Sequence, residues 1–161
     1  MLQDDTQASR EQVRNSALAS LTRREHGVAE LKTKLTAKFG DVALAEDAVE
    51  WLQELGYLDD KRFTEAFVRS SVARGRGPIR ITQELRQKGV DATLVEQAIA
   101  ELDVDWREQA RDVLERKFRQ PVADVSADKK ADMKEKARRV RYLQYRGFFP
   151  EDIFALVNGE R

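Results

Sequence analysis

The sequence contains no cysteine and only one histidine, His26, among its 161 residues. Without cysteine there is neither a disulfide framework nor a thiolate metal site, and a lone imidazole has no second imidazole with which to build a metal centre. We therefore expect a non-enzymatic protein with no catalytic residue, metal or cofactor. His26 falls at the junction of two predicted helices, where we interpret it as a capping or surface residue.

Long apolar stretches are also lacking. No run approaches the roughly 20 apolar residues that cross a bilayer. The opening residues MLQDDTQASR are polar and acidic, without the apolar segment of a signal peptide. Together with the absence of cysteine, these features predict a cytoplasmic protein with no membrane partner. Hydrophobic residues make up 41% of the chain, which is compatible with a modest core.

The chain shows no strand-like alternation, and its apolar residues recur at helical spacing, which predicts an all-α protein. Ser9 and Gln12 have the form of a capping box, and Gly40 with Asp41 reads as a helix end followed by a new N-cap. We expect the last helix to bury Ile153, Phe154, Leu156 and Val157. The helix after Asp41 should bury the apolar residues at helical spacing, which are Val42, Ala45, Ala48, Val49, Leu52 and Leu55. The expected helices cover about 9–23, 28–39, 41–55, 59–73, 78–89, 91–102, 105–120 and 126–145, with a loop at 121–127 and a last short helix after Gly147.

The segment Arg74–Val90, RGRGPIRITQELRQKGV, has the clearest local signals for the start and the end of a helix. Pro78 suits the first position of a helix, Gly89 suits its end, and Ile81 and Leu85 form its apolar stripe. Its RGRG sequence could cradle an anion with backbone N–H groups. The segment lacks the lysine, hydroxyl and preceding strand of a P-loop, so we predict no ATP binding.

Three parts of the chain align as a repeat. When Leu35, Leu85 and Leu143 are superposed, a basic residue follows each leucine three positions later, and an apolar pair follows thirteen and fourteen positions later. The basic residues are Lys38, Lys88 and Arg146, and the next positions hold Phe39, Gly89 and Gly147. We predict three tandem three-helix repeats that form an elongated, curved molecule. The expected divisions are a disordered tail at 1–8 and repeats at 9–55, 56–102 and 103–161, the last with a longer loop and a long basic helix.

The formal net charge is zero, with 29 basic and 29 acidic residues, but the charges are segregated. Residues 41–60 carry seven acids and no base, and 91–105 carry five acids and no base. In contrast, 61–90 and 129–146 each carry eight bases against two acids. The basic helices could form a stripe that follows a charged filament or phosphate backbone. Alternatively, acidic helices neutralise basic neighbours through surface pairs worth about 0–1 kcal/mol each.

The sequence KARRVRYLQYRGFF adds aromatic residues to the second basic segment. Its tyrosines could stack on a base or pack against a protein, and we expect at least one to be exposed. Arginine predominates among the candidates, and its planar guanidinium suits carboxylates and phosphates. The predicted basic binding surface comprises Arg74, Arg76, Arg80, Arg86, Lys88, Arg138, Arg139, Arg141, Tyr142, Tyr145 and Arg146.

Four segments in this order resemble the RecX regulatory proteins of bacteria: RREHGVAELKTKL, LQELGYLDDKRFTEAFVRS, RGRGPIRITQELRQKGV and RVRYLQYRGFFPEDI. The resemblance covers about Leu18 to Val157. It implies tandem three-helix repeats and a modulator that binds the RecA filament on single-stranded DNA. Such a modulator would limit filament extension, ATP hydrolysis, strand exchange and co-protease activity, with weak DNA binding of its own, and we expect a monomer. The alternative from the residues alone is a helix-turn-helix-like module that acts directly on nucleic acid.

Overall fold

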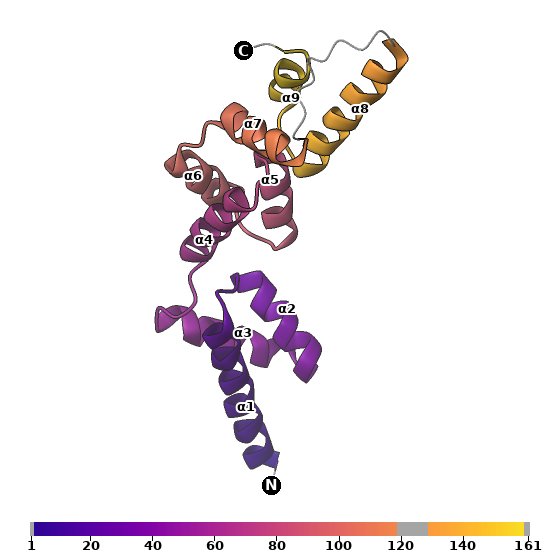
Figure 1. Ribbon diagram of the computed structural model, residues 1–161. Coiled ribbons are helices and arrows are strands. Elements are labelled where there is room, and N and C mark those ends of the chain that lie inside the picture. The colour runs from indigo at the N-terminus through magenta and orange to yellow at the C-terminus, as the bar shows by residue number, and fades with distance from the viewer. Residues whose placement is uncertain (1, 119–128, 160–161) are drawn as a thin grey trace. The chain divides into compact units, whose positions relative to one another are not determined.

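The computed structural model describes residues 2–118 and 129–159, with side chains from Ser9 onward. Within these ranges the chain forms nine α-helices and no strand (Figure 1), which confirms the all-α prediction. None of these helices combines the length and apolar character that a membrane span requires. The helices are α1 Leu2–Arg23, α2 Val28–Phe39, α3 Val42–Glu54, α4 Asp60–Ala73, α5 Pro78–Gln87, α6 Ala92–Leu102, α7 Trp106–Lys117, α8 Lys129–Arg146 and α9 Pro150–Val157.

The chain divides into two compact units. The first contains Met1–Ala66 and Leu85–Ala98, and the second contains Phe67–Glu84 and Ile99–Arg161. Helices α4, α5 and α6 each contribute residues to both units. The predicted repeat divisions at 9–55, 56–102 and 103–161, and the predicted elongated shape, stay predictions.

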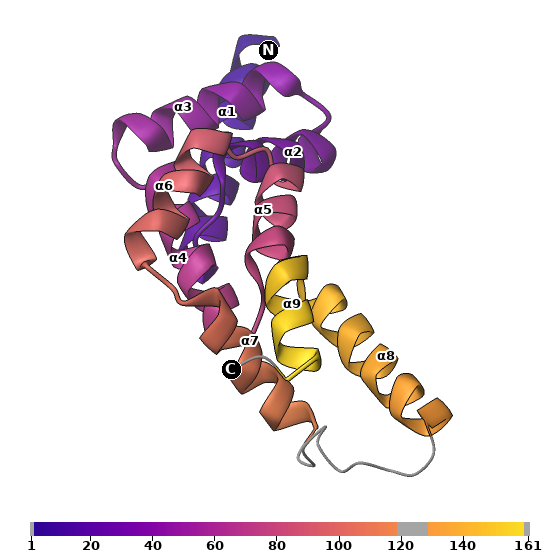
Figure 2. The same ribbon diagram turned by 90° about the horizontal axis from the view of Figure 1, so that it is seen from above.

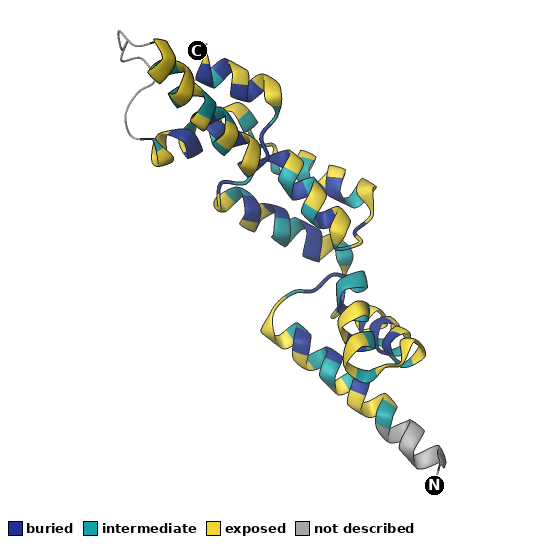
Figure 3. Cartoon of the chain, turned by 90° about the vertical axis from the view of Figure 1, so that its right-hand side faces the viewer, coloured by how far each residue is buried: buried dark blue, intermediate teal, exposed yellow. Residues whose placement is uncertain are grey.

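In the first unit, α3 packs against both α1 and α2. Gly40, with φ of 68°, ends α2, and the Asp41 side chain accepts a hydrogen bond from the Leu44 backbone N–H at 3.1 Å, as the sequence predicts. Each of these helices has a buried stripe (Figure 3). The buried residues of this core are Val13, Ala17, Leu31, Leu35, Ala45, Ala48, Val49, Leu52 and Leu58.

Two predictions for the first unit are wrong. Val42 and Leu55 are 52% and 50% exposed, because they stand at the two ends of α3, beyond the stretch whose apolar residues enter the core. Helix α1 begins at Leu2, so the expected helix start with a cap at Ser9 is wrong, while the division of residues 1–8 as a tail stays a prediction. No glycine or proline interrupts residues 2–8, so the helix continues through them.

In the second unit, α9 packs against both α7 and α8 (Figure 2). The predicted burial of Phe154 is wrong, since its side chain is 62% exposed. Helix α9 has only eight residues, and it buries one face through Ile153 and Val157, which leaves Phe154 on another. The predicted loop at 121–127 lies outside the described residues. The buried core residues are Ala110, Val113, Leu114, Leu143, Phe148, Ile153 and Val157.

Candidate interaction surface

The eleven predicted surface residues fall into two sets. Arg86 and Lys88 belong to the first unit, and the other nine belong to the second. Part of each set lies at or near a place where the start of one helix meets the end of another. We call these places the first joint, formed by residues 24–30, 60 and 88–89, and the second joint, formed by residues 74–80 and 146–147.

The second joint is made by backbone groups in close contact. The N–H of Gly77 donates to the carbonyl oxygen of Arg146 at 2.7 Å, and the N–H of Ile79 donates to that of Gly147 at 2.9 Å. A Cβ atom on Gly77 would lie 2.4 Å from the carbonyl carbon of Gly147. A Cβ on Gly147, where φ is 94°, would lie 2.3 Å from the Cβ of Arg80. Both glycines are therefore needed for the approach of the two backbones.

These contacts correct the interpretation of RGRG as an anion cradle. The N–H groups of Gly77 and Ile79, which would have faced an anion, donate to carbonyl oxygens of the protein itself. The positive end of α5 therefore meets the negative end of α8, an arrangement that the helix dipoles favour. The glycines of this segment position α5 rather than bind a ligand.

Arg146 strengthens the second joint with its side chain. Its Nε donates to the carbonyl oxygen of Gly75 at 3.1 Å, and a second guanidinium nitrogen donates to that of Arg74. The side chain is half-buried. The structure therefore places the predicted surface residue Arg146 in a contact within the protein. Arg74 itself is exposed and contributes its backbone carbonyl to this contact.

Arg80 and Tyr145 form a stack at the rim of the second joint. The Arg80 guanidinium lies 5.1 Å from the centre of the Tyr145 ring, and Tyr145 is 71% exposed, so at least one tyrosine is exposed as predicted. Arg80 Nε also donates to Glu84 Oε1 at 2.7 Å, and a guanidinium nitrogen of Arg76 lies 3.6 Å from Glu84 Oε2. The hydrogen bond that Arg80 donates to Glu84 raises the pKa of Arg80 above its ordinary value.

Tyr145 belongs to an exposed basic face of α8. Arg138, Arg141 and Tyr145 are spaced by three and four residues, so they share one side of the helix, and all three are exposed. We call these three residues the α8 face. Arg138 pairs with Glu135 at 3.2 Å in an exposed i,i+3 contact, which contributes little energy and leaves the arginine able to bind elsewhere.

Two predicted surface residues of α8 are instead part of the packing. Arg139 is 3% exposed, lies 2.5 Å from Glu135 Oε1, and places its guanidinium 4.7 Å from the Phe118 ring centre. Tyr142 packs edge-on against Phe118, with ring centres 5.7 Å apart. Arg139 precedes the fully buried Leu143 by four residues, so the helical period places it on the core side of α8.

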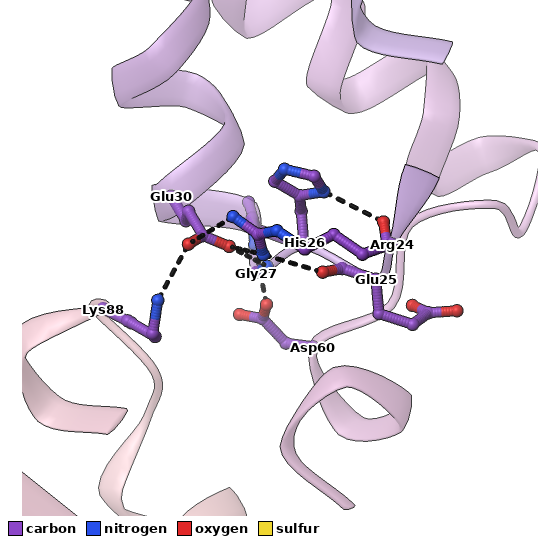
Figure 4. A network of polar contacts seen from close by, with 8 residues as sticks. Arg24, Glu25, His26, Gly27, Glu30, Asp60 and Lys88 are labelled. Carbon is purple, nitrogen blue, oxygen red and sulfur yellow. Dashed lines mark hydrogen bonds and ion pairs between the residues drawn. The ribbon is translucent and has the colours of Figure 1, made fainter. Parts of the chain in front are cut away.

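The first joint is ionic (Figure 4). Glu30 pairs with Arg24 at 3.1 Å and with Lys88 at 2.8 Å, although Lys88 lies 58 residues away in the sequence. The Val28 N–H at the start of α2 donates to Asp60 Oδ1 at 2.8 Å. Burial by itself would raise the pKa of Glu30, but the hydrogen bonds and charges of Arg24 and Lys88 outweigh it and lower that pKa to about 2. Lys88 is thus an ion-pair partner, whereas Arg86 is exposed.

His26 lies beside the first joint. It is 1% exposed, so the predicted surface role is wrong, while the capping role is confirmed in part because Nδ1 lies 3.0 Å from the carbonyl oxygen of Arg24 near the end of α1. A carbonyl oxygen only accepts, so Nδ1 carries the proton and Nε2 is the bare nitrogen. Nε2 has no hydrogen-bond partner among the described residues, and burial lowers the pKa of this imidazole.

Sequence reasoning missed the acidic residues that organise these joints. Glu84 follows Arg80 by four residues, a spacing that indicates a helical ion pair, so this contact had a readable signal. The pairing of Glu30 with Lys88 and that of Asp60 with Val28 had none, because these partners lie 58 and 32 residues apart in the chain.

The fold and this surface define an all-α protein of consecutive three-helix domains with a basic face on its last long helix. The model of the RecX second three-helix domain matches residues 59–99, and that of the RecX third three-helix domain matches residues 103–157. The chain belongs to the RecX family.

Relatives support this assignment along nearly the whole chain. The chain is 43% identical to the regulatory protein RecX of Halorhodospira halophila, over 92% of this chain and 88% of that protein. It is 38% identical to the regulatory protein RecX of Pseudomonas fluorescens, over 91% and 90%. The crystal structure of RecX from Lactobacillus salivarius has the same fold, with a TM-score of 0.74 at 21% identity over 95% of this chain and 97% of that one.

Proposed function

We propose that this protein is a non-enzymatic regulator of the RecA recombinase. It binds the RecA filament on single-stranded DNA and limits filament extension, ATP hydrolysis, strand exchange and co-protease activity. Membership of a family whose relatives are named regulatory proteins supports a regulatory role. The resemblance of the four sequence segments described above supports RecA as the partner. The role belongs to homologous recombination, DNA repair and the SOS response in the cytoplasm, with the protein acting as a monomer.

The observation that carries the proposal is the α8 face with the Arg80 stack beside it. Arg138, Arg141 and Tyr145 are exposed on one side of a rigid helix, and Arg80 stacks on the same tyrosine. Arginine and tyrosine are the residues most often found at the energetic centres of protein interfaces. We assign binding to these residues together with Arg74, Arg76 and Arg86. The remaining candidates act within the protein, and they are Lys88, Arg139, Tyr142 and Arg146.

The test is the rate of RecA ATP hydrolysis on single-stranded DNA as this protein is added. We expect the wild type to inhibit and the double variant Arg138→Glu with Arg141→Glu to lose at least about tenfold in potency, because both charges of the α8 face are reversed. The matched control is Lys129→Glu with Lys136→Glu, which makes the same charge change on another side of α8 and should inhibit like the wild type. The function is refuted if the wild type does not inhibit at any stoichiometry. Full inhibition by the folded α8-face variant would show that the α8 face does not bind the RecA filament.

A second candidate function is direct binding of single-stranded DNA. The exposed ring of Tyr145 beside the guanidinium of Arg80 favours it, because bases stack on such aromatic platforms. A direct DNA binder shows tight association that weakens steeply with salt. Fluorescence anisotropy with labelled poly(dT) from 50 to 200 mM salt decides between the two functions, and negligible binding at physiological salt would remove the second.

A further inference from the structure

Two guanidinium groups from the start of α5 and the loop before it converge on a single carboxylate of the same helix. Arg80 Nε lies 2.7 Å from Glu84 Oε1, and Arg76 lies 3.6 Å from Glu84 Oε2, so the two arginines hold different oxygens of one carboxylate. The three side chains are 22–27% exposed, and so they are neither buried in the core nor freely solvated. A pair of arginines in this arrangement has the donor set that binds a carboxylate or a phosphate.

The surroundings of this group favour a protein partner. Tyr145, on which Arg80 stacks, is among the most exposed large apolar side chains of the described residues, and Ile79, the residue before Arg80 in α5, is also exposed. Arginine and tyrosine are both enriched at the centres of protein interfaces. The group that the arginines hold in this structure is a carboxylate. An aspartate or glutamate of a partner protein therefore matches both the charge and the geometry.

We propose that Arg76 and Arg80 form a clamp for a carboxylate side chain of a partner protein, and that Glu84 occupies this clamp as an internal competitor. A partner carboxylate must displace Glu84 before it reaches both guanidinium groups. Glu84 therefore weakens binding by the strength of its own ion pairs, which corresponds to an affinity loss of about three- to fivefold. The proposal rests on the proposed function only for the identity of the partner.

The direct test is Glu84→Gln, which keeps the shape of the side chain and removes its charge. The matched control is Glu101→Gln, which makes the same change in net charge at an exposed position of α6 in the same unit. Affinity is measured by fluorescence anisotropy with labelled poly(L-glutamate) and with labelled poly(dT) at about 50 mM salt. We expect Glu84→Gln to bind poly(L-glutamate) about three- to fivefold more tightly than Glu101→Gln does. Adding Arg76→Gln and Arg80→Gln should abolish that gain, with helical content unchanged by circular dichroism.

Three results would overturn the proposal. Equal affinity of the two single variants means that Glu84 does not compete, and weaker binding by Glu84→Gln means that it orients the arginines instead. A gain on poly(dT) without a gain on poly(L-glutamate) assigns the clamp to phosphate rather than carboxylate. Titration of RecA ATP hydrolysis with the same variants separates the two proposals. Failure of the wild type to inhibit refutes the proposed function. The poly(L-glutamate) measurement still decides whether Glu84 competes for the two arginines.

Discussion

The two joints occupy corresponding places in the predicted repeat but are built from different interactions. The alignment pairs Lys88 with Arg146 and Gly89 with Gly147. In each joint this basic residue and the glycine after it meet the start of a preceding helix, α2 in the first and α5 in the second. Lys88 pairs with a carboxylate, whereas Arg146 and the glycine after it engage backbone groups. A basic residue followed by glycine therefore marks a contact in both repeats without specifying the chemistry of that contact.

This difference predicts different sensitivities. The first joint depends on charges, so a fall in pH or a rise in salt concentration should weaken it. The second depends on the close approach of two backbones, so steric changes should disrupt it while salt should have little effect. Three comparisons of variants, taken from the largest expected effect to the smallest, separate these two behaviours.

The largest effect is expected at the second joint, from Gly77→Ala. The new Cβ would lie 2.4 Å from backbone atoms of Gly147, which cannot move aside as a flexible side chain could. We expect a loss of about 3 kcal/mol in the free energy of unfolding, measured by urea denaturation. The control is Gly40→Ala, where φ is 68° and nothing lies within 4 Å, so backbone strain alone should cost about 1 kcal/mol. Equal losses for the two variants would contradict the close-approach interpretation.

The next effect is expected at the first joint, from Glu30→Gln. The folded-state pKa of Glu30 is lowered from 4.5 to about 2, so its charge stabilises the fold fully above pH 4.5, and this stabilisation is lost as the pH falls toward 2. At about 1.4 kcal/mol per pKa unit the full shift would correspond to about 3 kcal/mol, and solvent screening of this partly buried carboxylate reduces the expected loss at pH 7 to about 2 kcal/mol.

Urea denaturation at several pH values between 7 and 3 measures this effect, and the difference between wild type and Glu30→Gln should shrink below pH 4.5. Glu50→Gln, at an exposed position of α3, is the control and should change little. A difference that stays constant over this range would show that the ionised form of Glu30 is not what stabilises the joint.

The smallest effect compares exchanges of the two basic residues. Arg146→Lys loses the planar group that reaches two carbonyl oxygens, and we expect a cost of about 1.5 kcal/mol. Lys88→Arg keeps a positive charge beside Glu30 and should change stability by less than about 0.5 kcal/mol. Thermal unfolding followed by circular dichroism measures both, and equal costs would remove the distinction between the two joints.

Local signals predicted much of the fold. Residue preferences and apolar spacing within a few positions predict the end of α2 at Gly40, the cap at Asp41 and the burial of Ile81 and Leu85. The structure confirms all of these. Burial at helix ends was predicted less well, as Val42, Leu55 and Phe154 show. Periodicity gives the direction of an apolar face but not where the neighbouring helix stops covering it.

The exposure of the candidate surface residues could be predicted only in part, for the same reason. Arg138, Arg141 and Arg139 look alike in sequence, yet the first two are exposed and the third is enclosed beside Phe118. The contacts that Lys88 and Arg146 make within the protein could not be predicted either, because their partners come from distant segments.

The sequence by itself determined the helical class, most helix ends, the repeated basic residue and the family, because these depend on local preference and on residue order. Only the tertiary structure decided which basic side chains have partners within the protein and which are presented to solvent. The reason is physical: an ion pair or a backbone contact between residues 58 or 71 positions apart forms only after folding brings them within hydrogen-bond distance.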